Sequence, residues 1–381
     1  MSTIYPRQIL EHIHAYTAAQ GFFFTKQDIA NLYLCLKSKP FVILAGISGT
    51  GKTQLVRQFA RAMGHGNHCF LIPVRPDWTD HTDLLGYVDM QGNFRKQPFL
   101  EVLLQAQANP QHPYFIILDE MNLARVEHYF SDVLSIMETR EKKEDQIVSE
   151  PLMPYGVGRN EKENASIQDL TFPANLYLIG TINVDESTYP FSRKVLDRAN
   201  VIEMNEVFLD WPLVEEAVPP LDPVPHAFLL NPYVRLIDVP QSERHGMQPV
   251  IRLLTEINEI LSIADMPFGY RIRDEILFYL INRHDIRELI SHQEAIDLQI
   301  VQKILPRITG ATASIQQVIL GLINLFRPEK VGVFSEESTY MQIQQSLGDP
   351  RRKGYPYARS LQKLLKMYRR YEEEGFTSYW G

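Results

Sequence analysis

The chain has 381 residues, of which 45% are hydrophobic and 22% are charged, and its formal net charge is -8. A chain of this length and composition can bury a large core, and we expect two or three globular domains. The acidic charge excludes a protein that coats nucleic acid with its whole surface, although a local basic patch is still allowed. The sequence has no signal-peptide pattern and no apolar run long enough to cross a bilayer, which predicts a cytoplasmic protein.

The first domain is expected to begin with helices and then a buried strand. Residues 1–40 read as helices and leave no room for a sizeable DNA-recognition domain before that strand. Residues 41–44 form an apolar, β-branched run that is too short for a helix, and an amphipathic segment follows a glycine-rich turn. Strand, loop and helix are therefore expected between Phe41 and Ala60.

The glycine-rich turn, GISGTGKT, fits the P-loop pattern G-x-x-x-x-G-K-[ST]. Small residues let backbone N–H groups surround a phosphate, and the following helix points its positive end at the same phosphate. We expect Lys52 to reach the β- and γ-phosphates and the hydroxyl of Thr53 to bind Mg²⁺. The predicted nucleotide-binding residues are Gly46, Ser48, Gly49, Thr50, Gly51, Lys52, Thr53 and Gln54.

Two segments between the predicted core strands read as insertions. Residues 86–88 and 93–95 flank a Met-Gln-Gly turn, which predicts a β-hairpin. Residues 141–175 are charged with little periodicity and are expected to form a long loop or hairpin, either solvated or in contact with a pore or partner. Four polar residues before the first hairpin lack a second ligand cluster, so they are expected to cap helices and make subunit contacts instead of binding a metal. They are Asp77, Asp80, His81 and Asp83.

An acidic strand end is the next expected part of a P-loop site. Residues 114–118 form an apolar run that ends in Asp119 and Glu120. Because the carboxyl ends of parallel strands meet at one edge of a sheet, both carboxylates are expected beside the phosphate loop. Asp119 suits the Mg²⁺ shell. Glu120 suits activation of the attacking water, which a hydrolase needs and a simple nucleotide binder does not, so the pair predicts hydrolysis.

A third apolar run, residues 176–180, is followed by Thr181 and Asn183. A polar side chain on the strand beside the acidic one can hydrogen-bond the water that Glu120 activates, which is the role called sensor 1 in the AAA+ class of P-loop proteins. Asn183 is the candidate for this role.

Taken in order, these motifs resemble the AAA+ NTPase of McrB-type modification-dependent restriction systems, within the dynein-related group. The run DEMNLARVEHYFSDVLSIMETR carries the resemblance, with GISGTGKT before it and GTINVDES and VLDRANVIE after it, across residues 29–206. The predicted hairpin at residues 86–95 resembles the helix-2 insertion of the McrB and MoxR-like branch. Residues 182–187 read INVDES where McrB proteins typically have M-N-x-x-D-R-S, so ATP and GTP both remain open as substrates.

The resemblance implies a catalytic role for an arginine near the end of the core. Arg193 and Arg198 precede another apolar strand, residues 201–204. In ring-forming ATPases an arginine in this place reaches the γ-phosphate of the neighbouring subunit and stabilises the charge of the transition state. Both are candidates, with Arg198 preferred, and a plain surface position is the alternative. A homo-oligomeric, hexameric ring is therefore expected.

Prolines mark the predicted domain boundary. Residues 208–240 contain too many prolines for a helix interior, which predicts a linker. Before it we expect an α/β P-loop AAA+ core with a parallel sheet, residues 1–207. After it we expect an α-helical lid with a C-terminal helical region, residues 241–381. In AAA+ proteins such a lid donates an arginine, sensor 2, to the nucleotide. Arg271 and Arg273, at the start of a predicted helix, are the candidates, and a salt-bridged helix end is the alternative.

The last part of the chain, residues 351–381, interleaves basic residues with tyrosines, a mixture that can contact nucleic acid. An apolar stripe that includes Leu361, Leu364 and Tyr368 instead favours a packed helix with solvated charges.

Two functions remain open from the sequence. The first is a ring-forming, NTP-hydrolysing motor subunit of a McrBC-like restriction or defence complex, which drives a separate McrC-like or other nuclease subunit on DNA. The second is a MoxR-like chaperone or remodelling ATPase that acts on proteins. The motifs favour the first, with DNA contacted through partner subunits and without a membrane. Mg²⁺ is the expected cofactor, and the substrate is ATP or GTP. The base stays open because no N-K-x-D guanine signature is visible.

Overall fold

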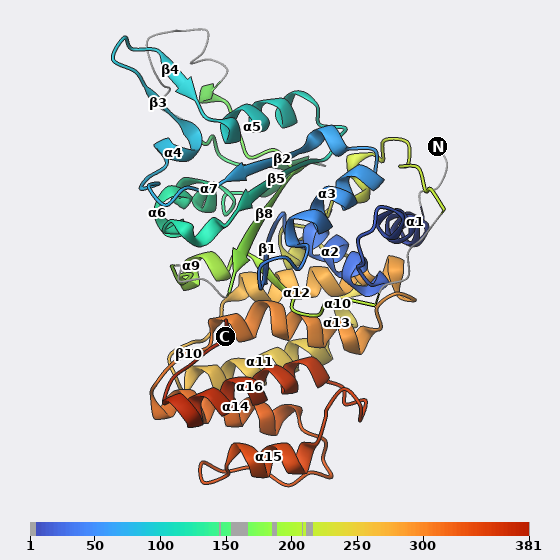
Figure 1. Cartoon of the computed structure of the whole chain (residues 1–381), viewed down its shortest axis with the longest axis vertical. Coiled ribbons are helices and arrows are strands. Elements are labelled where there is room, and N and C mark those ends of the chain that lie inside the picture. Colours follow the sequence, from blue (N-terminus) through green and yellow to red (C-terminus); the bar gives the residue numbers. More distant parts are fainter. Residues whose placement is uncertain are drawn as a thin grey trace. The chain divides into compact units, whose positions relative to one another are not determined.

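The computed structural model describes residues 5–144, 146–153, 167–184, 189–207, 209–210 and 216–380 of the chain. These residues divide into two compact units, within Met1–Asp238 and Val239–Gly381 (Figure 1). The first unit contains the α/β core that the sequence predicted, and the second contains the predicted helical region. Among the described residues, every helix is too short or too polar to cross a membrane.

A parallel five-stranded sheet forms the centre of the first unit, in the order β2-β5-β8-β1-β9. Gly46 at the end of β1 pairs with Asn183 at the end of β8, and Asp119 ends β5 on the other side of β8. The carboxyl ends of these three strands therefore meet at one edge of the sheet. The strands are β1 (Phe41–Gly46), β2 (Cys69–Pro73), β5 (Tyr114–Asp119), β8 (Leu176–Asn183) and β9 (Asn200–Glu203).

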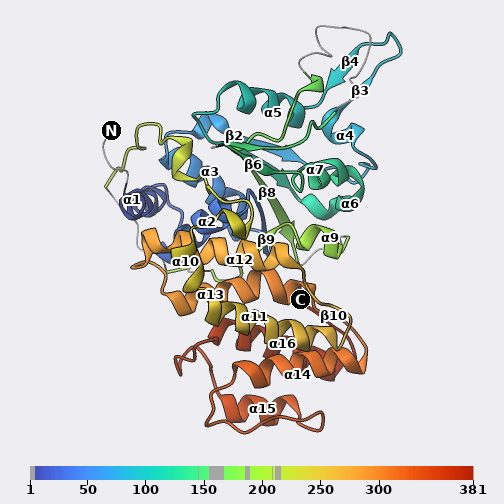
Figure 2. The same ribbon diagram turned by 180° about the vertical axis from the view of Figure 1, so that it is seen from behind.

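Helices cover both faces of this sheet, which explains why β1 and β8 are buried along their whole length. Helices α2 and α3 pack against β1 on one side, and α5 packs against β2 and β5 on the other (Figures 1 and 2). Thr25 and Asp28 cap the start of α2 with reciprocal side-chain to backbone bonds, so the residues just before the cap are also fixed in place. The helices of this unit are α1 (Pro6–Ala19), α2 (Lys26–Ser38), α3 (Lys52–Ala62), α4 (Thr82–Leu85), α5 (Pro98–Ala108), α6 (Val126–Tyr129), α7 (Ser131–Ile136) and α9 (Arg193–Leu196).

Both predicted insertions contain a hairpin. The Met-Gln-Gly turn joins β3 (Gly86–Val88) to β4 (Phe94–Lys96), and the carboxylate of Asp89 steadies the turn by accepting two backbone N–H bonds at 2.9 Å. In the second insertion β6 (Glu141–Lys143) pairs with β7 (Gln146–Val148). Residues 154–166 of that predicted loop lie outside the described residues.

Residues 216–238 of the predicted linker belong to the first compact unit and hydrogen-bond to it. The backbone N–H of Val224 donates to the carbonyl of Met63 at 3.0 Å. The ring of His226 hydrogen-bonds the hydroxyl of Tyr177, a residue of β8, at 2.9 Å. Burial lowers the pKa of His226 to about 4, so this ring is neutral at neutral pH and suits its enclosed position.

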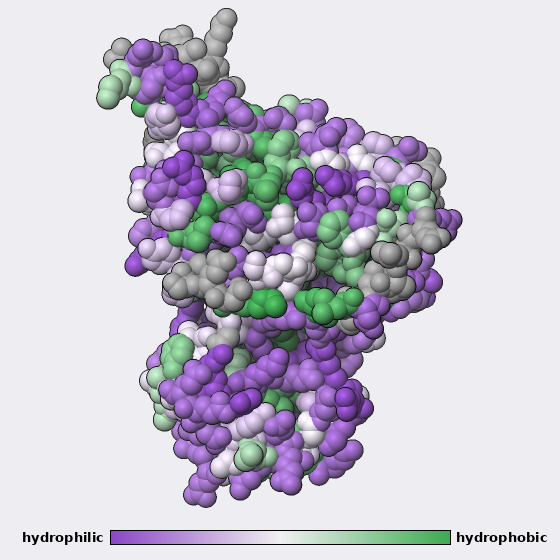
Figure 3. Space-filling view, in the orientation of Figure 1, coloured by the Kyte–Doolittle hydropathy of each residue, from purple (hydrophilic) through white to green (hydrophobic). Residues whose placement is uncertain are grey.

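The second unit is a group of packed helices with one short two-stranded sheet. The apolar stripe of α16 is buried as predicted, from Leu361 to Tyr368, while Arg369 pairs with Glu373 on the exposed side. On the face shown in Figure 3, hydrophilic side chains cover most of this unit. Its helices and strands are α10 (Gln241–His245), α11 (Gln248–Ser262), α12 (Tyr270–Asn282), α13 (His292–Gln299), the π-helix Ile300–Ile304, β10 (Thr309–Gly310), α14 (Ala313–Phe326), α15 (Tyr340–Leu347), α16 (Ala358–Glu374) and β11 (Thr377–Ser378).

Candidate functional site

The carboxyl edge of the sheet borders a pocket of about 470 Å³ within the first unit. The P-loop after β1 forms one wall, Asp119 and Glu120 at the end of β5 form another, and Thr181 and Asn183 of β8 lie beside them. The fold thus brings the predicted phosphate-binding, metal-binding and water-activating groups into one place. Asp185, Glu186 and Ser187, which follow the sensor 1 candidate, lie outside the described residues.

The glycines of the P-loop meet two different demands. Gly49 and Gly51 have φ angles of 82° and 86°, in the left-handed region that other residues rarely adopt. Gly46 is needed for space, because a Cβ atom there would overlap the backbone carbonyl of Met204. Helix α3 begins directly after Gly51, so its positive end lies at the loop.

Replacing Gly46 by alanine is therefore expected to destabilise the protein by about 3 kcal/mol, since the overlap is with backbone that cannot rotate away. The matched control is Gly49→Ala, where a Cβ meets open space and only the left-handed φ is strained, at about 1 kcal/mol. Urea unfolding of both variants without nucleotide gives the comparison. An unchanged unfolding midpoint for Gly46→Ala would contradict the role of close approach.

The side chain of Lys52 lies within the curl of the P-loop. It is only 7% exposed, and its Nζ donates to the carbonyls of Gly46 and Ile47 at 3.0 and 2.7 Å. The charge of Lys52 already lies at the phosphate loop. Its three N–H donors can turn from the two carbonyls to a phosphate without any movement of the backbone.

Asp119 is at the centre of a hydroxyl network. Its Oδ1 accepts a hydrogen bond from Thr53 at 3.0 Å and another from Thr181 at 2.7 Å. A threonine hydroxyl and a carboxylate are the oxygen ligands that Mg²⁺ prefers, and both line the pocket next to the phosphate loop. Thr53 and Asp119 would therefore hold Mg²⁺ at this site.

Glu120 is held from strand β8 by two contacts. Its backbone N–H donates to the hydroxyl of Thr181 at 3.1 Å, and its Oε1 accepts from Nδ2 of Asn183 at 3.2 Å. Its φ of 52° is a left-handed conformation that is uncommon outside glycine. Uncommon backbone held in place by neighbours is typical of functional sites. The carboxylate and the amide are thus held in direct contact at the pocket.

Sequence reasoning missed the residues at the other end of the pocket. Residues 21–24, between α1 and α2, line it with a glycine and three phenylalanines, and Glu206 and Val207 after β9 line it as well. The run GFFF directly before the helix cap Thr25 is the signal that could have found them, because three consecutive aromatic side chains in a connection need apolar surroundings. Thr181 was read only as a polar residue at a strand end.

The two arginine candidates differ in their surroundings, and the role of each toward a neighbouring subunit stays a prediction. Arg198 is 7% exposed, its Nε donates to the carbonyl of Leu134 at 3.2 Å, and its guanidinium forms an ion pair with Glu138. These contacts lie within the chain, and through them Arg198 connects the segment after α9 to α7. Arg193, the first residue of α9, is exposed.

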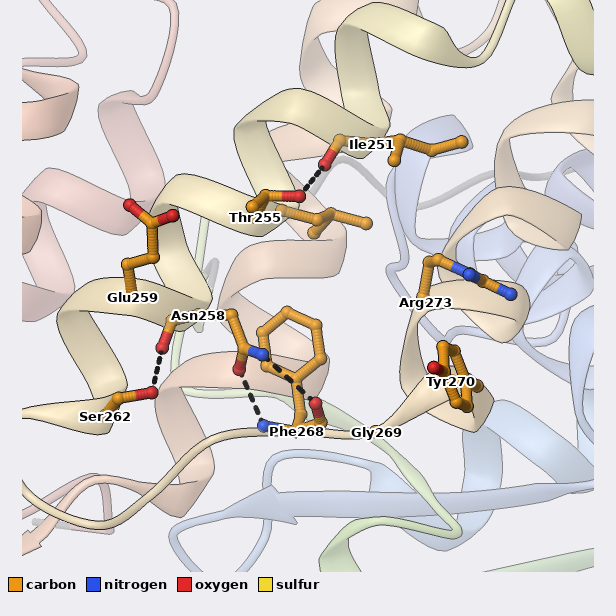
Figure 4. Close-up of a pocket in the computed structure, with 10 residues that line it drawn as sticks. Ile251, Thr255, Asn258, Glu259, Ser262, Phe268, Gly269, Tyr270 and Arg273 are labelled. Carbon is orange, nitrogen blue, oxygen red and sulfur yellow. Dashed lines mark hydrogen bonds between the residues drawn. The ribbon is translucent and has the colours of Figure 1, made fainter.

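Arg271 and Arg273 belong to the second unit, at the start of α12. Arg271 is exposed, whereas Arg273 pairs with Asp274 at 2.6 Å and lies over the ring of Tyr270, 5.0 Å from its centre. Figure 4 shows Arg273 and Tyr270 on one side of a pocket of about 500 Å³ between α11 and the start of α12. Their role toward a nucleotide stays a prediction.

A P-loop, an acidic strand end and a polar strand end around one pocket define the site of a P-loop nucleoside triphosphatase. Residues 41–199 match the AAA domain (dynein-related subfamily), and residues 225–376 match a domain of unknown function (DUF8727). Residues 41–199 thus form an AAA+ domain of the dynein-related group, similar to that of McrB, as their motifs predicted. A domain of this group hydrolyses a nucleoside triphosphate, typically with Mg²⁺.

The chain is 25% identical over 187 residues to the type IV methyl-directed restriction enzyme EcoKMcrB subunit of Escherichia coli (strain K12), across 48% of this chain and 39% of that protein. It therefore spans well under half the length of this relative. Among solved structures, a protein of Cytophaga hutchinsonii ATCC 33406 provisionally described as an ATPase matches at 16% identity, with a TM-score of 0.43 over 77% of this chain and 87% of that chain. The closed state of Hsp104 with ATPγS and casein matches at 18% identity, with a TM-score of 0.33 over 52% and 36%.

Proposed function

We propose that the chain is the ring-forming, NTP-hydrolysing motor subunit of a McrBC-like restriction complex, which drives a separately encoded nuclease subunit on DNA. The observation that carries hydrolysis is the single pocket in which Lys52, Asp119 and Glu120 converge. The restriction role is supported by the similarity to a subunit of a methyl-directed restriction enzyme. DNA would be contacted through partner subunits.

The residues of the pocket divide the work of hydrolysis. The P-loop backbone and Lys52 would bind the phosphates, Thr53 and Asp119 would hold Mg²⁺, and Glu120 would accept a proton from the attacking water. Mg²⁺, when bound, neutralises charge on the phosphate oxygens. Asn183, 3.2 Å from Glu120, orients the same water through its amide.

A neighbour's arginine would complete each site in the ring, and Arg193 is the better candidate because it is exposed at the start of α9. We expect turnover per subunit to rise with protein concentration as hexamers form. Arg193→Ala should bind nucleotide yet lower kcat by about 10³-fold or more. Mixing Arg193→Ala with Glu120→Gln subunits should recover activity, because some junctions then pair an intact Glu120 with an intact Arg193.

Arg198→Ala is the matched comparison for this experiment. Because Arg198 is paired with Glu138 inside its own subunit, its loss should lower the thermal unfolding midpoint, and mixing with Glu120→Gln should recover nothing beyond its own activity. Turnover by Arg193→Ala at the wild-type rate would contradict a catalytic arginine supplied by the neighbouring subunit. Wild-type turnover that is independent of protein concentration would contradict it as well.

The proposed function is tested by measuring ATP and GTP turnover of the purified protein alone and with the product of the adjacent gene. Stimulated hydrolysis together with DNA cleavage by that partner is the expected result. An adjacent metal-binding adaptor of the von Willebrand type, with no nuclease, would instead favour a MoxR-like ATPase that remodels proteins.

A further inference from the structure

We infer that Thr181 is a positioning residue that couples the metal-binding carboxylate of Asp119 to the catalytic base Glu120. This inference rests on the proposed hydrolysis, and it identifies Thr181 as the group that positions the two acidic residues. The hydroxyl of Thr181 donates to Oδ1 of Asp119 at 2.7 Å and accepts the backbone N–H of Glu120 at 3.1 Å. One hydroxyl thus contacts both acidic residues at the end of β5.

The contacts use the hydroxyl in the only way its chemistry allows. A threonine hydroxyl has one proton to donate and can accept through its lone pairs, and Asp119 takes the proton because an ionised carboxylate only accepts. Thr181 is 2% exposed and lies in a strand whose every residue is buried. A polar side chain at so buried a position needs hydrogen-bond partners, and Asp119 and Glu120 supply them.

The Asp119 oxygen that Thr181 contacts is also the acceptor of the Thr53 hydroxyl, at 3.0 Å. When Thr53 turns to a metal ion, Thr181 remains as the protein group that orients the carboxylate. Partners behind a metal ligand typically change metal affinity or activity by about 10- to 100-fold when they are removed. Thr181 occupies that position behind Asp119.

The second contact of Thr181 fixes the backbone of Glu120. Glu120 has a φ of 52°, and the bond from its N–H to Thr181 holds this conformation. Asn183 contacts the Glu120 side chain from the same face of β8, because residues two apart in a strand point the same way. Strand β8 therefore holds the base through both its backbone and its carboxylate.

The test replaces Thr181 by valine, which keeps the shape and removes the hydroxyl. We expect kcat to fall by about 10- to 100-fold while KM changes less than about threefold. We also expect the gain in nucleotide affinity on adding Mg²⁺, measured by titrating a fluorescent ATP or GTP analogue with Mg²⁺ or with EDTA, to shrink by about tenfold. The affinity in EDTA should stay at the wild-type value, and Thr181→Ser should restore both readouts.

Thr17→Val is the matched control. Thr17 is fully buried in α1, outside the pocket, and its hydroxyl donates to the carbonyl of His14 at 2.8 Å. Its replacement should change only the unfolding midpoint. If Thr181→Val does not fold, Thr181→Ala and Thr181→Ser are compared instead. Both variants lose the methyl group and only alanine loses the hydroxyl, so the difference between them still measures the effect of the hydroxyl.

Three results would overturn the inference: wild-type kcat and Mg²⁺ dependence in Thr181→Val, an equal loss of affinity with Mg²⁺ and with EDTA, or no rescue by serine. The Mg²⁺-dependent affinity is read without turnover. A wild-type protein that binds nucleotide but never hydrolyses it would therefore count against the proposed function, and the role of Thr181 would still be decided by binding.

Discussion

Replacing Lys52 by alanine is expected to weaken nucleotide binding by at least about 100-fold, or about 3 kcal/mol. The ammonium group is buried in the P-loop and bonded to the carbonyls of Gly46 and Ile47, so it needs no rearrangement of the chain to meet a phosphate. Alanine removes the charge and leaves those carbonyls facing the phosphate oxygens. Titration of a fluorescent nucleotide analogue with the purified variant measures the loss.

Lys37→Ala is the control for the loss of a lysine. Lys37 lies in α2 of the same unit, and its Nζ donates to the hydroxyl of Tyr33 at 2.9 Å, away from the pocket lining. This variant should bind nucleotide as the wild type does. Equal affinity of Lys52→Ala and wild type would mean that the pocket at the sheet edge is not the nucleotide site.

Replacing Glu120 by glutamine is expected to keep nucleotide affinity within about threefold of wild type while lowering kcat by about 10²- to 10⁴-fold. Glutamine keeps the size and the oxygen that accepts from Asn183, but it cannot take a proton from water. The backbone of residue 120 should be unchanged, because its bond to Thr181 is made by the main-chain N–H. Phosphate release under saturating nucleotide gives kcat, and the fluorescent analogue gives the affinity.

Glu101→Gln is the matched control, since Glu101 is an exposed residue of α5 and undergoes the same change of charge. It should turn over normally. Turnover of Glu120→Gln at the wild-type rate would remove Glu120 from the role of base, and lost binding by this variant would point to a structural role instead.

The parts of the site that could be predicted are those formed by short, continuous stretches of sequence. The P-loop, the pair Asp119 and Glu120, and Asn183 each follow an apolar strand, and a parallel sheet brings such strand ends together whatever else the chain does. The hairpin of β3 and β4 was predictable for the same reason, because its turn and both strands are adjacent in the sequence.

What could not be predicted depends on contacts between distant segments. Nothing near Arg198 in the sequence shows that Glu138, on a different element, takes its charge. The pocket lining by residues 21–24 depends on where α2 packs, and the role of Thr181 depends on the register between β5 and β8. Composition alone predicted a linker at residues 208–240, and it could not show that residues 221, 224 and 226 hydrogen-bond to the first unit.

That packed segment sets where the first unit can be cut. A fragment that stops at residue 207, just past the last core strand, would uncover Tyr33 and Tyr177, which contact Phe228 and His226 in the whole protein. The ring of Tyr33 lies 4.7 Å from that of Phe228, so the cut would leave an aromatic surface open to water and to other copies of the fragment. We therefore expect a nucleotide-binding fragment to need the chain up to residue 238, where the first compact unit ends.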